Sequence, residues 1–225
     1  MRARVNRTAQ AFDGLADRYD AWYDTAPGRV LFVLELGALR PLLAGTAGPR
    51  LEVGVGSGRF AAALGIDVGL DPAEGPLRFA KARGVRVPRG VGSQLPFGGN
   101  TFGAVAVIVT LCFVENPAAV LAEVGRVLRP GGRLVVGLVP LDSAWCRSYE
   151  EKGRAGHPFY RHARFETLAE HRQMLATAGF RPVEARSTLF QAPSDEPVAG
   201  PVRSDAVNGA GFVALAAQRE SAGAD

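Results

Sequence analysis

Three glycines and two acids in the first third of the chain have the types and spacing of a nucleotide-binding site. Gly54, Gly56 and Gly58 alternate with other residues directly after a short apolar segment. Glu52 lies within that segment, and Asp71 follows Gly54 by 17 residues. Glycines at a strand-to-helix turn let backbone N–H groups approach a ligand closely. An acid at the end of the next strand binds ribose hydroxyls in doubly wound nucleotide-binding folds. Together these features predict one adenosine site.

The glycine spacing distinguishes this site from one for a dinucleotide. The dinucleotide motif GxGxxG would place its third glycine at position 59, where this chain has Arg59. A nicotinamide-dependent dehydrogenase is therefore disfavoured. A glycine turn that only reverses the chain direction would leave Glu52 and Asp71 unexplained.

A second group of chemically active side chains follows residue 140. All three histidines of the chain lie there: His157, His162 and His171. Tyr149, Phe159 and Tyr160 accompany His157, and these four side chains are our candidates for an aromatic substrate wall with one titratable group. His157 is the candidate general base. The alternative is that the aromatic residues fill the core and the histidines are solvated.

The two cysteines favour no catalytic or metal-binding role. Cys112 and Cys146 are too few for a disulfide framework and do not form a CxxC redox pair, so we expect reduced thiols. Cys112 follows an apolar segment where a nucleophile could stand, but a small buried role suits it better. Cys146 and the histidines lack the spacing of a tetrahedral zinc site, so no metal site is expected.

Short β-branched runs alternate with amphipathic stretches, which predicts β-α-β units wound around a parallel sheet. The expected class is α/β, with a Rossmann-like, doubly wound, seven-stranded and mostly parallel sheet whose last strand is antiparallel. The expected strands are residues 50–53, 68–70, 85–87, 104–109, 133–138, 181–187 and 211–217. The expected helices include residues 7–24, 28–43, 76–83, 117–128 and 166–178. Pro130 and Gly131 predict a type II turn before the fifth strand.

Size and composition indicate one compact globular domain, since the chain has 225 residues of which 47% are hydrophobic. Its longest apolar run, residues 104–114, is shorter than the ~20 residues of a membrane-spanning helix. The N-terminus has no apolar stretch of the kind found in secretory signals. We therefore expect a cytoplasmic protein without a membrane partner, and the sequence leaves its oligomeric state open.

The basic residues do not favour a nucleic-acid partner. The formal net charge is +4, but 24 of the 26 basic residues are Arg and only 2 are Lys. Such a skew is more typical of coding bias than of a phosphate-binding surface, which usually mixes both residues in clusters.

Four motifs resemble those of a known family. Glu52-x-Gly54-x-Gly56-x-Gly58, GLDP at 69–72, LPF at 95–97 and RVLRPGG at 126–132 are similar to motifs of class I S-adenosylmethionine-dependent methyltransferases of the type 11 group. The likeness spans about residues 10 to 140. It implies S-adenosylmethionine as cofactor and methyl transfer by in-line displacement. A small-molecule acceptor is expected because nearly all of the chain is cofactor domain, while an RNA or protein acceptor and a non-catalytic cofactor-binding module are the alternatives.

The resemblance also implies roles for individual residues. Residues 52–58 would surround the amino-acid end of the cofactor, Asp71 would bind its ribose, and residues 93–95 would flank adenine. Tyr19 would close the site from above, and Thr110 would lie near the methionine moiety. The full expected set is Tyr19, Glu52, Gly54, Gly56, Gly58, Asp71, Pro72, Ser93, Gln94, Leu95 and Thr110.

Two positions depart from the family pattern. Val91 stands where an acid near adenine is usual, so backbone groups or Gln94 must contact the base. Gly103 stands where Asp usually follows Phe before the next strand. The segment TLCFVENP after that strand also lacks the Asn/Asp-Pro-Pro-Tyr motif of enzymes that methylate nucleic-acid bases or glutamine.

The resemblance suggests a division of the chain into parts. Residues 1–45 would form an N-terminal helical lid, and residues 46–220 would form the cofactor-binding core. Residues 141–163 would be an insertion on the substrate side, and residues 221–225 a disordered tail. The Pro-rich loop 191–208 would complete the pocket, form a dimer contact or be disordered.

Overall fold

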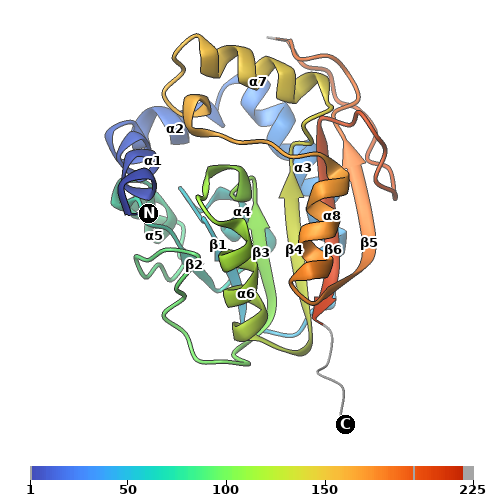
Figure 1. The fold of residues 1–225 in the computed structure, drawn as a ribbon. Helices are drawn as coiled ribbons and strands as arrows, with labels where there is room; N and C mark the ends of the chain where they lie inside the picture. The colour runs from blue at the N-terminus through green and yellow to red at the C-terminus, as the bar shows by residue number, and fades with distance from the viewer. Residues whose placement is uncertain (1, 195, 220–225) are drawn as a thin grey trace.

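The computed structural model describes residues 2–194 and 196–219 of the chain, so the expected tail at 221–225 lies outside the described residues. Its centre is a sheet in which six strands run in the order β2-β1-β3-β4-β6-β5 (Figure 1). The strands, all within the described residues, are β1 Arg50–Val53, β2 Val68–Leu70, β3 Phe102–Ile108, β4 Leu128–Leu138, β5 Phe180–Thr188 and β6 Phe212–Arg219.

The sheet is mostly parallel, as the sequence predicts. Strand β1 pairs in parallel with β2 and β3, and β3 pairs in parallel with β4. The last strand, β6, is antiparallel to both β4 and β5. The predicted α/β class and the antiparallel last strand are therefore confirmed.

Two strand predictions need correction. Residues 85–87 form no strand, because their ladder with β2 is reduced to one parallel bridge between Val68 and Arg86. Strand β4 also begins five residues before position 133. Leu128 pairs with Phe102, the register then shifts, and Gly131 takes a φ of 71° between the two stretches. Glycine permits that left-handed conformation, so the predicted Pro-Gly turn lies inside the strand.

Helices cover both faces of the sheet, with α6 and α8 in front and α3 and α4 behind (Figure 1). Alternate residues of β3 point to the two sides: Ala106 and Ile108 join the core with α3, and Val105 and Val107 join the core with α6. The α-helices are α1 Arg2–Gly14, α2 Ala16–Trp22, α3 Ala26–Leu43, α4 Arg59–Leu64, α5 Glu74–Ala82, α6 Pro117–Val127, α7 Ala144–Arg154 and α8 Leu168–Thr177.

The N-terminal region is two helices and not the single helix expected over residues 7–24. The break falls at Leu15, between α1 and α2. Thr25 is the N-cap of α3, because its Oγ1 accepts a hydrogen bond of 3.1 Å from the Gly28 backbone N–H. Helices α1 and α2, with α7 and the short 3-10 helix η2 Tyr160–His162, lie beyond the ends of the parallel strands (Figure 1).

Within the described residues, no helix combines the length and the apolarity of a membrane span.

Candidate functional site

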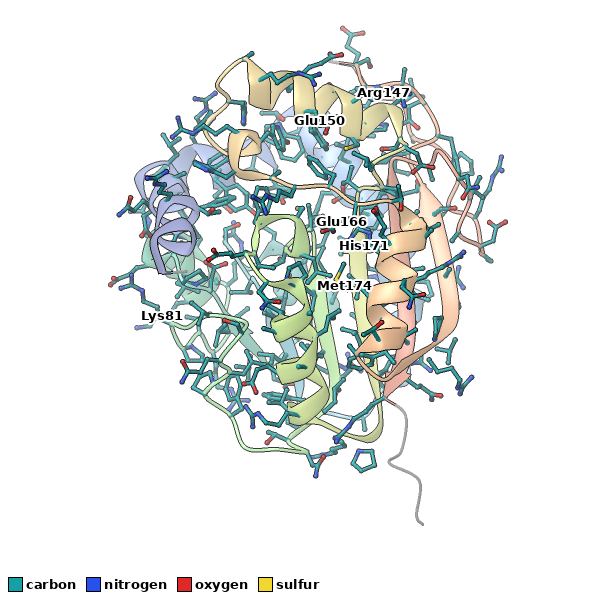
Figure 2. All side chains as sticks on the ribbon, in the orientation of Figure 1. Lys81, Arg147, Glu150, Glu166, His171 and Met174 are labelled. Atoms are coloured by element: carbon teal, nitrogen blue, oxygen red, sulfur yellow. The ribbon has the colours of Figure 1, made fainter. Side chains whose placement is uncertain are left out.

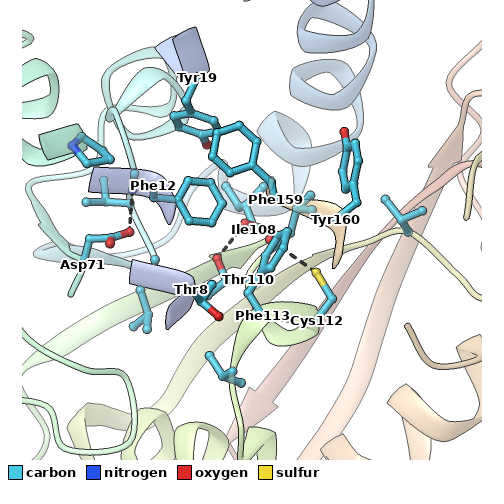
Figure 3. A pocket seen from close by; sticks show the side chains of 18 of the residues that line it. Thr8, Phe12, Tyr19, Asp71, Ile108, Thr110, Cys112, Phe113, Phe159 and Tyr160 are labelled. Carbon is cyan, nitrogen blue, oxygen red and sulfur yellow. Dashed lines mark hydrogen bonds between the residues drawn. The ribbon is translucent and has the colours of Figure 1, made fainter. Parts of the chain in front are cut away.

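A cavity of about 990 Å³ opens where three parallel strands end. Gly54 follows β1, Asp71 follows β2 and Thr110 follows β3 by two residues, and all three residues line the cavity. In open α/β sheets, ligands bind in the crevice outside the carboxyl ends of the strands. The sheet topology therefore places the glycine turn where a ligand is expected, together with Asp71 and Thr110, which Figure 3 shows.

The three glycines of the turn have left-handed backbone conformations, with φ of 78° at Gly54, 50° at Gly56 and 76° at Gly58. A Cβ at Gly54 would lie 2.3 Å from the Thr110 hydroxyl oxygen. At Gly58 it would lie 2.6 Å from the Ala80 Cβ, so Gly58 brings α4 against α5 and does not line the cavity. The turn thus needs glycine for its own conformation and for close packing.

The Asp71 carboxylate is held by backbone donors at the cavity wall. Its Oδ2 accepts from the Gly56 N–H at 3.0 Å and its Oδ1 from the Ala73 N–H at 2.9 Å. Burial raises the pKa of Asp71 to about 6, against these two hydrogen bonds. The two bonds fix the side chain and leave further lone pairs for hydroxyl donors of a ligand.

Glu52 is a buried acid with an unsatisfied oxygen. It is 2% exposed and lines the cavity, and its Oε2 has no hydrogen-bond partner among the described residues. Burial and the neighbouring charge of Asp71 raise its pKa well above the ordinary range. A buried polar atom without a partner is costly, so this oxygen is suited to accept from a bound ligand.

The next wall is formed by a turn at residues 91–94, in which the Gln94 N–H donates to the Val91 carbonyl at 3.1 Å. Ser93 and Gln94 line the cavity, as does Pro72 beside Asp71. Leu95 lies behind them, 4% exposed, and its N–H donates to Glu123 at 2.7 Å. Leu95 therefore supports this wall from the core.

Helices α1 and α2 roof the cavity and contact the insertion. Phe12 stacks on Phe159 with ring centroids 4.6 Å apart and meets Tyr19 edge to face at 5.2 Å (Figure 3). The Tyr19 hydroxyl lies over the glycine turn, because a Cβ at Gly56 would be 3.1 Å from it. Burial raises the pKa of Tyr19 to about 12, which keeps the phenol neutral.

The four residues expected as a substrate wall all line the same cavity: Tyr149, His157, Phe159 and Tyr160. Tyr149 stacks on Tyr160 with centroids 4.4 Å apart, and His157 stacks on Tyr160 at 4.5 Å. The wall is built by α7 and η2, so the insertion faces the cavity as well as packing on the sheet.

The His157 ring is held by the backbone that follows it. Its Nδ1 accepts from the N–H groups of Phe159, at 3.4 Å, and Tyr160, at 3.5 Å. Partial burial and the charges of Arg18 and Lys152 lower its pKa, so the imidazole is neutral near pH 7. With Nδ1 accepting, the proton is on Nε2, which is then a hydrogen-bond donor.

Comparison with known proteins identifies the family. Residues 51–136 match the family model described as a methyltransferase domain. A solved structure of an S-adenosylmethionine-dependent methyltransferase from Thermotoga maritima is 30% identical, with a TM-score of 0.86, and the alignment covers 95% of this chain and all of that one. The chain belongs to the S-adenosylmethionine-dependent methyltransferases.

Other relatives of this methyltransferase carry different descriptions. An uncharacterized protein of Mycobacterium tuberculosis is 47% identical over 203 residues, which are 90% of this chain and 71% of that protein. An uncharacterized protein of Methanocaldococcus jannaschii is 34% identical over 180 residues, or 80% of this chain and 85% of that protein. A demethylmenaquinone methyltransferase of Mycobacterium tuberculosis is 32% identical over 156 residues, 64% of each chain.

The site fits the cofactor of this methyltransferase family. S-adenosylmethionine carries hydroxyl and ammonium donors, and the cavity offers it the Asp71 carboxylate and the unpartnered Glu52 oxygen. At Gly56, the carboxylate end of S-adenosylmethionine can approach the backbone of the turn closely. These features agree with S-adenosylmethionine as the cofactor.

The two departures from the family pattern have different settings. A Cβ at Gly103 would lie 2.1 Å from the Ala47 carbonyl oxygen, so backbone proximity excludes an acid there. Val91 lines the cavity, where an acidic side chain would have room. Gly103 is therefore a packing requirement, whereas Val91 changes the cavity wall of the methyltransferase.

The cavity also contains an acid that is not among the predicted site residues. Glu35 lies on α3, is 9% exposed and lines the cavity together with Tyr23. A signal was available: Glu35 follows Leu31 by four residues and precedes Leu39 by four, so an acid occupies the apolar stripe of the helix.

His171 and the two cysteines have settings that disfavour reaction chemistry, although Cys112 lines the cavity. The His171 ring is 4% exposed; its Nε2 lies 3.3 Å from Glu166 and its Nδ1 2.9 Å from the Thr167 carbonyl (Figure 2). Cys112 and Cys146 are free thiols whose pKa values burial raises, which disfavours thiolate chemistry. Among the described residues, no three His, Cys, Asp or Glu side chains form a group that could hold a metal ion.

Proposed function

We propose that this methyltransferase moves the methyl group of S-adenosylmethionine to a small-molecule acceptor bound between the glycine turn and the tyrosine-rich wall. The observation that carries the proposal is that one cavity is lined by both. Its volume of about 990 Å³ lies at the upper end for small-molecule sites, which favours room for an acceptor beside the cofactor.

The cofactor side is assigned to residues at the strand ends. Asp71 would hold the ribose hydroxyls, Glu52 and the glycine turn the amino-acid end, and Ser93 and Gln94 the adenine. Bound S-adenosylmethionine supplies an electrophilic methyl carbon. The protein then has to align the acceptor with that carbon, an effect worth several kcal/mol or more. Phe12 and Tyr19 in the roof exclude water from the reacting groups.

The acceptor side is assigned to the insertion and α3. Tyr149, Phe159 and Tyr160 would enclose a small acceptor, and His157 would contact it as the titratable group of the wall. A roofed cavity of this kind favours a small molecule over an RNA or protein, which would need a broad contact surface.

The relatives support methyl transfer from S-adenosylmethionine, but they do not agree on the acceptor. The Thermotoga maritima structure is described as a possible histamine N-methyltransferase. The Mycobacterium tuberculosis relative that is 32% identical is described as a demethylmenaquinone methyltransferase. These two acceptors differ in charge and size. The acceptor of this chain must therefore be argued from its own cavity.

Calorimetric titration tests the cofactor assignment. We expect micromolar binding of S-adenosylmethionine and S-adenosylhomocysteine and none of NAD, and about tenfold weaker binding in Asp71→Ala, since a charge-assisted hydrogen bond is lost. Incubation with S-adenosylmethionine labelled in its methyl group then tests the acceptor class. Label in the low-mass fraction of a cell extract supports the proposal, and label in the RNA or protein fraction alone contradicts it.

A further inference from the structure

Glu35 is an acid placed where the fold gives it no partner. It lies on the apolar face of α3, is 9% exposed and lines the acceptor side of the cavity. Among the described residues, its carboxyl group forms no hydrogen bond or ion pair. Burying a carboxyl group without a partner is unfavourable, so a compensating group is expected from a ligand.

Aromatic side chains surround this carboxyl group. All four tyrosines and both tryptophans of the chain line the cavity: Tyr19, Tyr23, Tyr149, Tyr160, Trp22 and Trp145. The negative charge of Glu35 is close enough to raise the pKa of each tyrosine. Tyr149 and Tyr160 present a stacked pair, and Tyr19 and Tyr23 meet edge to face at 5.8 Å. Aromatic faces and a carboxylate both attract cations.

The other charges at the cavity do not neutralise Glu35. Arg18 and Lys152 line it from exposed positions and act on His157, whose pKa they lower. Glu52 and Asp71 lie at the strand ends, on the cofactor side. Burial raises the pKa of Glu35 to about 8, and no cation among the described residues contributes an opposing shift.

We propose that the acceptor is an amine, whose protonated nitrogen binds Glu35 between the tyrosines and gives a proton to that carboxylate before methyl transfer. The inference rests on the proposed function and adds the acceptor class to it. An anionic acceptor such as a phenolate would bring no cation to partner this carboxyl group.

The proton and electron balance is simple. An N–H bond of the ammonium breaks, its proton goes to the Glu35 carboxylate, and the electron pair stays on nitrogen. That pair forms the new N–C bond while the C–S bond of the donor breaks and its pair stays on sulfur. The proton then leaves Glu35 for water. A carboxylate whose conjugate acid has a pKa near 8 is a stronger base than an ordinary carboxylate, which makes the proton transfer from an ammonium group less unfavourable.

Matched ligand pairs test the inference by binding alone. The protein saturated with S-adenosylhomocysteine is titrated calorimetrically with phenethylamine and 2-phenylethanol, tryptamine and tryptophol, and octylamine and octanol. Each pair shares one frame and differs in the cationic nitrogen. Wild-type protein and the isosteric variant Glu35→Gln are compared. The control is Glu151→Gln, because Glu151 is exposed and does not line the cavity.

We expect wild type and Glu151→Gln to bind at least one amine about tenfold or more tightly than its alcohol, and Glu35→Gln to lose that preference. Titrations at pH 7 in two buffers should also show release of about one proton per bound amine in wild type and none in Glu35→Gln, because the cation forces Glu35 to ionise.

Two outcomes overturn the inference: equal affinity for amine and alcohol in all three pairs, or an amine preference that survives in Glu35→Gln. Failure of S-adenosylhomocysteine to bind is a different result, which contradicts the proposed function. The ligand pairs are then titrated into the protein alone, where the same comparison still decides the role of Glu35.

Discussion

The Arg59 guanidinium donates to the Asp20 carboxylate, with its Nε 2.9 Å from Oδ1. This ion pair joins the helix after the glycine turn to the roof helix α2. Arg59 also contacts Asp24 at 2.7 Å, and Arg83 contacts Asp20 at 2.9 Å. The residue that takes the place of a third motif glycine thus fastens the roof to the cofactor site.

Replacement of Arg59 by Gln should loosen the roof. We expect S-adenosylhomocysteine to bind about tenfold more weakly, and the free energy of unfolding to fall by about 1–2 kcal/mol, because Asp20 would lose a partner at a largely buried position. The control is Arg78→Gln, which removes the exposed pair with Asp17 and should change little. Similar loss of affinity in both variants would refute the role of Arg59.

The same ion pairs should make the roof sensitive to acid. Desolvation alone would raise the pKa of Asp20. The hydrogen bonds that Arg59 and Arg83 donate to its carboxylate outweigh this effect and lower the pKa to about 2. A lowered acid pKa stabilises the folded state above about pH 4, and this stabilisation is lost as the pH falls toward 2. Wild-type protein should therefore lose more stability between pH 5 and pH 2.5 than Asp20→Asn, in chemical denaturation at each pH.

Glu35 should have the opposite effect on stability. Burial raises its pKa to about 8, so the folded state holds this proton more tightly than the unfolded chain, whose carboxyl titrates near 4.5. Stability then falls as pH rises from 4.5 to 8. Glu35→Gln should match wild type at pH 4.5 and melt at least about 3 °C higher at pH 9. An equal difference in melting temperature at both pH values would contradict this prediction.

The two departures from the family pattern should respond differently to restoration of the acid. Val91→Asp places a carboxylate on the adenine wall and should tighten S-adenosylhomocysteine binding about fivefold or more, by calorimetry. Gly103→Asp should destabilise the protein by about 3 kcal/mol or more, because its Cβ would meet the Ala47 carbonyl at 2.1 Å. A well-folded Gly103→Asp, or unchanged affinity in Val91→Asp, would count against these assignments.

Local patterns in the sequence predict most of the sheet and the ends of its strands. The glycine turn, Asp71 and Thr110 share one cavity because parallel strands end at one edge, which topology alone dictates. The prediction of a strand at residues 85–87 was wrong, since this three-residue segment at the sheet edge keeps only one bridge, through Arg86. The role of Arg59 was missed because its partners, Asp20 and Asp24, lie far away in the chain. Glu35 carried a local signal as an acid in an apolar helix stripe, but its place at the cavity depends on how α3 packs.

The pH dependence of turnover distinguishes the two candidate bases. Glu35 must be ionised to take a proton, and its pKa is raised to about 8, so its active fraction rises tenfold per pH unit below 8 and levels off above it. His157 has its Nδ1 engaged by the backbone N–H groups of Phe159 and Tyr160, which leaves Nε2 as a donor. With an amine acceptor, kcat/KM should therefore rise toward pH 8 in wild type and in His157→Gln. In Glu35→Gln this rise should disappear, with kcat/KM at least about tenfold lower at pH 8. Loss of the rise in His157→Gln and its survival in Glu35→Gln would assign the base to His157.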